Sequence, residues 1–267
     1  MSDTGVLVLA HGSKDNRWVA EIDRAVQALT LDAPVTVGFL EMVEGRSIAR
    51  GVQGLEEKGV QEIVALPLFV CSGSTHLDEI QYALGLKTAP AVETELAPVP
   101  RRSTINWVAP MDDHPVVVQI ITERIRTLSV APAEETVLLV AHGSDKPGFQ
   151  EEWERTLASL SRSIQGAFPF KEVAYATVHP YTIRTQAEKL AQASKRMIVI
   201  PLFISEGYYT KTYIPAQLAG LDYVYDGRTY LPHPLVSRWM EEQICQTGRV
   251  QGLEARSINT SNLAKEG

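Results

Sequence analysis

Cysteine is nearly absent from this sequence, and its scarcity excludes two classes of protein. Only Cys71 and Cys245 occur among the 267 residues, and neither has a second cysteine nearby. Two such distant cysteines provide neither a framework of disulfide bonds nor the paired cysteines of a structural zinc site. We expect both to be reduced thiols.

Long apolar runs are also missing. The longest ones, such as residues 137–141, are far shorter than the ~20 residues that a helix needs to cross a membrane, so we expect no transmembrane helix. The first five residues contain no lysine or arginine, and the apolar stretch that follows ends at His11 rather than at a cleavage site of small residues. Because these features do not match a signal peptide, we expect a cytoplasmic protein.

Positive charge is scarce as well. The 25 lysine and arginine residues are outnumbered by 32 aspartate and glutamate residues, which gives a net charge of −7. Nucleic acid binds to basic surfaces that neutralise its phosphates, so this composition argues against nucleic acid as the main partner. The sequence motifs of P-loop nucleotide hydrolysis, dinucleotide binding, zinc-protease helices and serine-hydrolase turns do not occur either. We therefore expect no nucleotide cofactor.

The composition is that of a globular protein, and the sequence consists of two similar halves. Hydrophobic residues make up 45% of the chain and charged residues 21%, which fits one large domain or two small ones. Residues 6–13 (VLVLAHGS) recur as residues 137–144 (VLLVAHGS), and residues 63–69 (IVALPLF) recur as residues 198–203 (IVIPLF). The repeat predicts two tandem, structurally similar domains and a polar tail, at residues 1–130, 131–250 and 251–267.

The order of the predicted elements indicates an α/β fold. Short, continuous apolar runs are typical of strands in a parallel sheet that is buried on both faces. We expect strands at residues 6–10, 35–40, 63–66, 91–96, 137–141, 173–177, 197–200 and 223–231. We expect helices at residues 18–29, 47–58, 76–84 and 116–128, with a linker at residues 129–133. Each half should therefore form a parallel sheet flanked by helices.

Three ionisable residues follow the predicted strands of the first half. His11 follows the first strand, Glu41 follows the second, and His76 lies in the loop after the third. The carboxyl ends of parallel strands open on one side of a sheet, so we expect these side chains to converge. Two imidazoles and a carboxylate suit a divalent ion such as cobalt, iron, nickel or zinc. The same groups would also serve as an acid–base set, because histidine titrates near neutrality.

The second half carries an altered version of this set. Its corresponding positions hold, in order, His142, Thr177 with His179 close by, and Thr210. Taken singly, His142 and His179 are more simply explained as hydrogen-bonded residues at the edge of the sheet. His114 and His233 each precede a proline at a predicted loop or helix start, so we interpret them as surface or capping residues.

The order and spacing of three short motifs resemble a known family. These motifs are His-Gly-Ser after the first strand, Phe-Leu-Glu at residues 39–41 followed by Ser47 and Ile48, and Pro-Leu-Phe at residues 67–69 followed by a loop histidine. Together they are similar to the class II tetrapyrrole chelatases, in particular the long, two-domain sirohydrochlorin cobaltochelatase or ferrochelatase type. The resemblance spans nearly the whole chain, duplication included.

The resemblance implies a reaction and a set of residues. It implies a lyase that inserts Co²⁺ or Fe²⁺, with Ni²⁺ as a further candidate, into sirohydrochlorin without ATP, on the way to cobalamin or sirohaem. The reaction would take place in a cleft between the two halves, with the metal held by His11, Glu41 and His76. The carboxylates of sirohydrochlorin call for a local cationic rim, for which loop positions offer Arg46, Arg101, Arg102 and Lys211. Apolar cover for the ring would come from Phe69, Tyr208 and Tyr209, and we predict Arg46, Lys211 and Tyr208 as substrate-binding residues.

Departures from the family pattern leave the substrate open. Family members have a loop with histidine and lysine that ends in Ile-Pro after the third strand. The first half keeps the histidine at residues 74–80 but lacks the proline, whereas the second half keeps Ile-Pro at residues 210–215 but lacks the histidine. A related tetrapyrrole or another metal is compatible with the same three ligands.

Two interpretations from other classes also stay open. In the first, the protein binds a metal or tetrapyrrole without catalysing insertion. In the second, the histidines are structural residues of a different α/β enzyme that acts on a small anionic substrate. For the main interpretation, the expected partners are a tetrapyrrole and a divalent metal ion, with neither nucleic acid nor a membrane. The expected state is a monomer or a homodimer.

Overall fold

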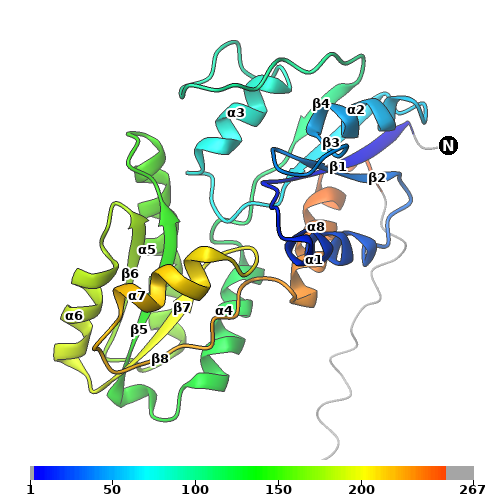
Figure 1. The fold of residues 1–267 in the computed structure, drawn as a ribbon. Coiled ribbons are helices and arrows are strands. Elements are labelled where there is room, and N and C mark those ends of the chain that lie inside the picture. The colour runs from blue at the N-terminus through cyan, green and yellow to red at the C-terminus, as the bar shows by residue number, and fades with distance from the viewer. Residues whose placement is uncertain (1–2, 251–267) are drawn as a thin grey trace, which may run out of the picture.

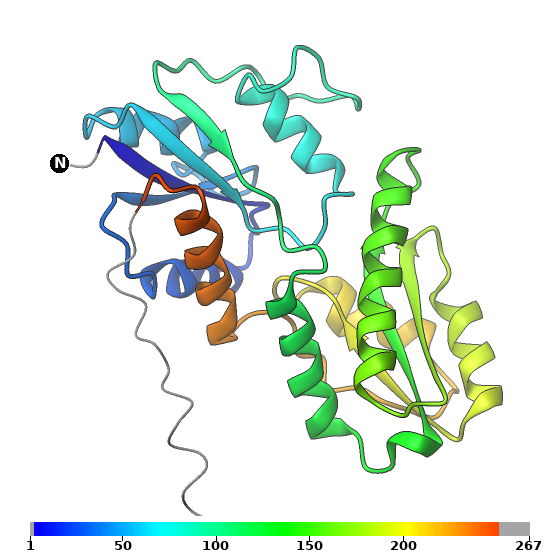
Figure 2. The same cartoon turned by 180° about the vertical axis from the view of Figure 1, so that it is seen from behind.

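The computed structural model describes residues 3–250, and the predicted tail at residues 251–267 lies outside the described residues (Figures 1 and 2). The strands are β1 (Thr4–Ala10), β2 (Val35–Phe39), β3 (Glu62–Pro67), β4 (Thr104–Trp107), β5 (Glu135–Gly143), β6 (Glu172–His179), β7 (Arg196–Pro201) and β8 (Tyr223–Val224). The α-helices are α1 (Asn16–Gln27), α2 (Ile48–Glu56), α3 (Thr75–Ala83), α4 (Pro115–Leu128), α5 (Phe149–Ala167), α6 (Ile183–Ala193), α7 (Ile214–Gln217) and α8 (Pro234–Gln246). A 3₁₀ helix, η1 (Pro132–Glu134), and a π-helical turn, η2 (Tyr209–Tyr213), complete the described elements.

The two halves have the same sheet topology. The strand order is β2-β1-β3-β4 in the first sheet and β6-β5-β7-β8 in the second, and the strands of both sheets are parallel. The central strand β1 is buried along its whole length, as the continuous apolar run predicts for a sheet covered on both faces. The predicted α/β fold with two tandem, similar domains is confirmed.

The strand predicted at residues 91–96 is wrong. This segment is irregular, and the Ala91 amide donates to Asp78 Oδ2 at 2.5 Å instead of joining a sheet ladder. The fourth strand is β4, which pairs with β3 in register from Glu62 with Thr104 onward. Its sequence, Thr-Ile-Asn-Trp, is short and half polar, so an apolar-run criterion misses it.

The last strand predicted in the second half is too long. Only β8 at the start of residues 223–231 pairs with β7. Further along, the amides of Tyr230 and Leu231 donate to carbonyl oxygens in the loop after β7. The acceptors are Phe203 at 2.9 Å and Ile204 at 2.8 Å. Apolar side chains here are buried by loop packing, and an apolar run does not distinguish this from a strand.

Polar side chains fix where several helices begin. Asp15 accepts a hydrogen bond from the Arg17 amide and caps α1, and Ser47 caps α2 in the same way. His114 and His233 accept from backbone amides at the starts of α4 and α8, each just before a proline, which confirms their predicted capping role. No helix within residues 3–250 combines the length and apolarity needed to cross a membrane.

Helices α4 and α8 exchange sides between the halves. The chain leaves the first sheet after β4, and α4 then packs on β7 and α5 of the second half, where the Arg124 guanidinium donates to the Pro201 carbonyl at 3.2 Å. Conversely, α8 packs on β3 and α1, where the Ser237 hydroxyl donates to the Ala25 carbonyl at 2.9 Å. Both views show α4 beside the second sheet and α8 beside the first (Figures 1 and 2).

This exchange joins the inner faces of the two sheets into one apolar core. The core includes one face of each central strand together with α1, α4, α5 and α8, as shown by the shared cluster of Val6, Val8, Ile22, Val117, Ile120, Val137, Leu139, Leu157, Val236 and Trp239. The outer faces form two separate cores under α2 with α3 and under α6 with α7. The predicted domain boundary at residue 130 stays a prediction, because each half is covered by a helix from the other side of it.

Glu135 anchors the linker between the halves. Its buried carboxylate accepts hydrogen bonds from the Ser129 hydroxyl, from the Val130 amide at 3.0 Å and from Arg196 Nε at 2.8 Å. Burial by itself raises the pKa of this carboxyl, but the hydrogen bonds from Ser129 and Val130 and the nearby Arg196 outweigh it. The pKa of Glu135 therefore lies below its ordinary value of 4.5.

Replacing Glu135 by glutamine is expected to lower the free energy of unfolding at pH 7 by about 1–3 kcal/mol, because a charge-assisted acceptor is lost in a buried place. A carboxyl with a lowered folded pKa stabilises the fold above its unfolded pKa of about 4.3 and loses this effect as the pH falls through the folded pKa. Urea unfolding at pH 7 and between pH 5 and 3 should thus show a shallower acid loss for Glu135→Gln than for wild type. The exposed neighbour Glu134→Gln is the control, and equal profiles for the two variants would contradict the assignment.

Candidate active site

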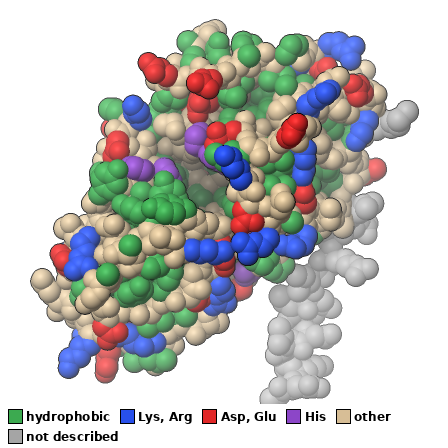
Figure 3. Space-filling model, viewed as in Figure 1, with side chains coloured by type: hydrophobic (Ala, Val, Ile, Leu, Met, Phe, Trp, Pro, Cys, Tyr) green, Lys and Arg blue, Asp and Glu red, His purple; other side chains and the backbone are tan. Residues whose placement is uncertain are grey.

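A cavity of about 920 Å³ lies between the two halves. Its lining comes from the loops that follow β1 and β3 in the first half and β5, β6 and β7 in the second. Strands β1 and β3 in the first sheet, and β5 and β7 in the second, flank the point where the strand order reverses. This is the place where α/β proteins bind ligands. Figure 3 shows the hollow with histidine at its edge. The volume is near the upper end of small-molecule sites, so the cavity admits a large ligand.

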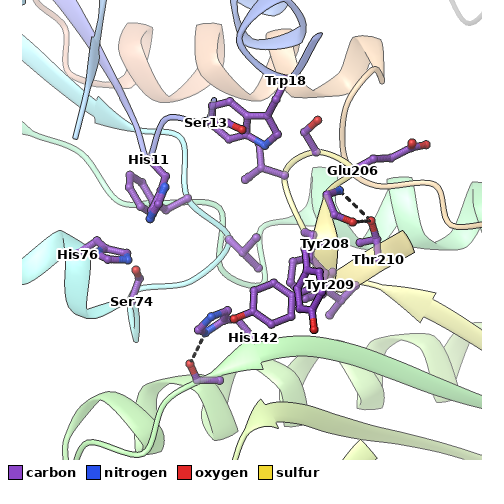
Figure 4. A pocket seen from close by; sticks show the side chains of 18 of the residues that line it. His11, Ser13, Trp18, Ser74, His76, His142, Glu206, Tyr208, Tyr209 and Thr210 are labelled. Carbon is purple, nitrogen blue, oxygen red and sulfur yellow. Dashed lines mark hydrogen bonds between the residues drawn. The ribbon is translucent and has the colours of Figure 1, made fainter. Parts of the chain in front are cut away.

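His11 and His76 face each other in this cavity (Figure 4). Their ring centroids lie 4.7 Å apart at an interplanar angle of 73°. His11 Nδ1 lies 3.0 Å from the Gly12 carbonyl oxygen, which can only accept, so Nδ1 carries the hydrogen and a neutral ring leaves Nε2 free. Glu41 Oε1 lies 3.5 Å from that Nε2. A bound cation would satisfy both of these facing acceptor atoms.

Glu79 orients the second imidazole, a role that was not predicted from the sequence. Its Oε2 lies 2.9 Å from His76 Nδ1, one turn further along α3. Because a carboxylate accepts, His76 also carries its hydrogen on Nδ1 and keeps Nε2 free when neutral. A carboxylate behind a histidine is typical of metal-binding imidazoles, and the His-x-x-Glu spacing on a predicted helix was the available signal.

The carboxylate of the predicted set lies slightly apart. Glu41 contacts His11, yet it is half-exposed and does not line the cavity itself. Within residues 3–250, no three His, Cys, Asp or Glu side chains are grouped as a ready-made metal centre. The structure thus brings His11 and His76 together and places Glu41 against His11.

The loop that precedes α3, and so positions His76, is held by the second half. A Cβ on Gly73 would lie 2.5 Å from the Phe149 carbonyl oxygen and 2.6 Å from Trp153 Cδ1, so this glycine lets the loop touch α5. Cys71 in the same loop is a free, buried thiol within 3.5 Å of the Thr156 hydroxyl, and burial raises its pKa to about 12. It is therefore a packing residue and not a reactive thiolate.

The second half repeats this construction with different side chains. His142 ends β5 as His11 ends β1, and its Nδ1 lies 3.1 Å from the Gly143 carbonyl oxygen. The Glu41 position is taken by His179, which pairs with Gly143 at the ends of β5 and β6. Tyr209, and not the predicted Thr210, stands against His142 as His76 stands against His11, edge-on at 5.3 Å. The Thr210 hydroxyl is instead buried and hydrogen-bonded within its own turn.

All four of these histidines line the one cavity. Burial lowers the pKa of His142, and the nearby His179, His76 and His11 lower it further, against a smaller raising effect of the Gly143 carbonyl. The His142 imidazole is therefore neutral near pH 7. The sequence alone does not reveal that the histidines of the two halves share a space.

Of the four predicted cations, only Lys211 lines the cavity. It forms an ion pair with Glu206 at 2.9 Å. The Arg46 guanidinium is instead held by both Asp23 oxygens at 2.6 and 2.9 Å and lies 4.7 Å over the Phe39 ring. Arg101 donates to two carbonyl oxygens and Arg102 pairs with Glu56, outside the cavity. The other cationic side chains that line the cavity, which were not predicted, are Arg17 and Lys146.

Aromatic side chains form part of the cavity wall, as expected. Tyr208 is 66% exposed and packs on Tyr209 at 5.6 Å, and both belong to the second half. Phe69 and Trp18 line the cavity from the first half. Apolar rings thus approach the cavity from both sides.

Comparison with known proteins assigns the family. The family model described as CbiX matches residues 5–128 and again residues 136–247, once in each half. The chain belongs to the CbiX family. No curated protein matches this CbiX-family sequence.

Solved structures resemble this CbiX-family chain over most of its length. SirB from Bacillus subtilis with Fe³⁺ has a TM-score of 0.67 and 17% identity, and the match covers 92% of this chain and 96% of that chain. The sirohydrochlorin chelatase SirB from Bacillus subtilis subspecies spizizenii in complex with cobalt also gives 0.67 and 17%, covering 92% and 95%. CbiX, described as the terminal enzyme for biosynthesis of siroheme in denitrifying bacteria, gives 0.58 and 22%, covering 91% and 98%. These likenesses show a shared fold.

Proposed function

We propose that this protein inserts a divalent metal ion, Co²⁺ or Fe²⁺, into sirohydrochlorin or a closely related tetrapyrrole without consuming ATP. The observation that carries the proposal is a pair of imidazoles, His11 and His76, whose Nε2 atoms are free and which face a large cavity between two halves. Membership of the CbiX family supports it, as does the shared fold with SirB structures that hold Fe³⁺ and cobalt.

In this proposal the first half holds the metal substrate. His11 and His76 offer one Nε2 atom each, and Glu41 adds a negative charge beside His11. Imidazole and carboxylate together suit divalent iron and cobalt. Three ligands leave positions for water, so the ion is held loosely enough to be passed on to the ring nitrogens.

The cavity supplies the environment for the macrocycle. Phe69 and Trp18 on one side and Tyr208 and Tyr209 on the other provide apolar cover for its faces. Lys211, Arg17 and Lys146 provide positive charge for its carboxylates within an otherwise acidic protein. Holding the ion and the ring in one cavity replaces a bimolecular encounter by a unimolecular step.

The balance of charge indicates where the protons go. A divalent ion that enters the ring displaces two pyrrole protons. As the ion leaves His11 and His76, both Nε2 lone pairs become available and accept these protons, which then pass to water through the open cavity. General-base assistance of this kind contributes about 10²- to 10⁴-fold to the rate.

Anaerobic absorption spectroscopy tests the proposal. Sirohydrochlorin is mixed with Co²⁺, Fe²⁺ or Ni²⁺, with and without the protein, and the change of the tetrapyrrole spectrum is followed. We expect the protein to raise the rate of metallation at least ~100-fold for one of the three ions. An unchanged rate with all three would overturn the proposal, and binding of the tetrapyrrole without faster metallation would favour a non-catalytic carrier.

The setting of the reaction is also part of the proposal. We place it in the cytoplasm, with the tetrapyrrole and the metal ion as partners and the chain as a monomer or a homodimer. Light scattering after size-exclusion chromatography measures the oligomeric state directly.

A further inference from the structure

The imidazole pair of the second half, His142 and His179, has no part in the proposed insertion step. Its ring centroids lie 5.2 Å apart at 49° to one another. Two imidazoles that bind one ion at a metal–nitrogen distance of about 2.1 Å have centroids about 4.5–5.5 Å apart. Edge-to-face packing of rings produces similar distances, so the ring distance does not distinguish a metal site from simple packing. What distinguishes them is whether the nitrogen atoms are free to bind an ion.

Both rings have an acceptor beside Nδ1, which favours the form that leaves Nε2 free. His142 Nδ1 faces the Gly143 carbonyl oxygen at 3.1 Å, and His179 Nδ1 faces Asp145 Oδ2 at 3.4 Å. The Gly143 carbonyl oxygen can only accept, so His142 Nδ1 carries a hydrogen and the neutral ring keeps a lone pair on Nε2. The Asp145 carboxylate beside His179 Nδ1 favours the same form of the His179 ring. A carbonyl or carboxylate behind the ring is the usual support of a metal-binding histidine.

The backbone is built to bring these two rings together. Gly143 has a φ of +74°, and a Cβ there would lie 1.9 Å from the His179 carbonyl oxygen. Only glycine therefore lets the ends of β5 and β6 approach closely enough for this pairing. Gly12 makes the same approach to the Glu41 carbonyl oxygen in the first half, where the imidazole of His11 meets an acidic partner.

The charges around the pair favour a cation. Asp145 is the carboxylate next to His179 and is more than half exposed, which leaves an oxygen free to offset positive charge. Lys146 also lines the cavity, but the pair itself contains no fixed positive charge.

We propose that His142 and His179 bind a second divalent transition-metal ion through their Nε2 atoms, on the wall of the cavity opposite His11 and His76. Imidazole suits Co²⁺, Ni²⁺ and Zn²⁺, and water completes the shell. Tyr209 stands edge-on to His142 and closes one side of this site (Figure 4). The inference does not depend on the proposed insertion reaction, since it concerns binding of the ion alone.

Binding of Co²⁺ to the full chain without tetrapyrrole tests this site. Equilibrium dialysis counts the ions, and the visible absorption bands of Co²⁺ report nitrogen ligands. We expect two ions for wild type, one for the H142A/H179A variant and one for the H11A/H76A variant. The H114N/H233N variant removes two histidines outside the cavity while asparagine still caps both helices, so it should bind two.

The outcomes separate the two proposals. Equal numbers of ions in wild type and H142A/H179A would overturn the second site, and so would a single ion that both cavity variants lose, because that ion would be shared. Should H142A/H179A fail to fold, the exposed Asp145→Asn replaces it and should weaken one site about 10- to 100-fold. Loss of an ion in H142A/H179A but none in H11A/H76A would keep this inference and count against the first-half metal site.

Discussion

Replacement of His11 or His76 by alanine is expected to slow metal insertion into sirohydrochlorin by more than ~100-fold while the protein stays folded. Each imidazole offers a free Nε2 atom to the cavity, and loss of even an outer partner of a metal ligand costs about 10- to 100-fold. The two side chains are 35% and 39% exposed. Truncation therefore leaves no buried hole, and the free energy of unfolding should change by no more than about 0.5 kcal/mol.

Two measurements on the same variants check this expectation. Initial rates of anaerobic metallation report the chemistry, and urea unfolding reports the stability. His114→Asn is a suitable control because it changes a histidine outside the cavity and keeps a helix cap. A wild-type rate in both alanine variants would remove His11 and His76 from the reaction. A loss of several kcal/mol of stability would instead indicate that the histidines are structural.

Gly12→Ala is expected to destabilise the protein strongly. Gly12 has a φ of +102°, and a Cβ there would lie 2.0 Å from the Glu41 carbonyl oxygen. The left-handed backbone and the forced shift of a neighbouring strand end each cost about 1–3 kcal/mol, so the free energy of unfolding should fall by about 3 kcal/mol or more. Because the shift moves Glu41 away from His11, metal insertion should slow as well.

Other glycines of this chain provide the matched controls. Gly45 also has a positive φ, +72°, but nothing lies within 4 Å of its Cβ position, so Gly45→Ala should cost only about 1–2 kcal/mol. Gly54 lies inside α2 in open space, and Gly54→Ala should stabilise the protein by about 0.5–1 kcal/mol. Urea unfolding of the three variants is the measurement. A Gly12→Ala variant no less stable than Gly45→Ala would contradict the role of the close approach.

The separation of predicted and unpredicted site residues has a physical basis. His11, Glu41 and His76 were predictable because each follows a strand, and parallel strands end on one side of a sheet. Arg46 was predicted at the same edge by sequence distance alone, but its long side chain reaches away from the cavity to the Asp23 carboxylate. Glu79 was missed because its role depends on the direction of a helix and not on the end of a strand.

The repeated segments in the sequence determined the α/β class, the tandem halves and most of the strands, because buried parallel strands have a continuous apolar pattern that needs no partner to be seen. Tertiary structure alone decided the exchange of α4 and α8, the position of β4 and the meeting of His11, His76, His142 and His179 in one cavity. These features depend on contacts between segments that are distant from one another in the sequence. A local pattern specifies which face of an element is apolar, but not which distant element covers it.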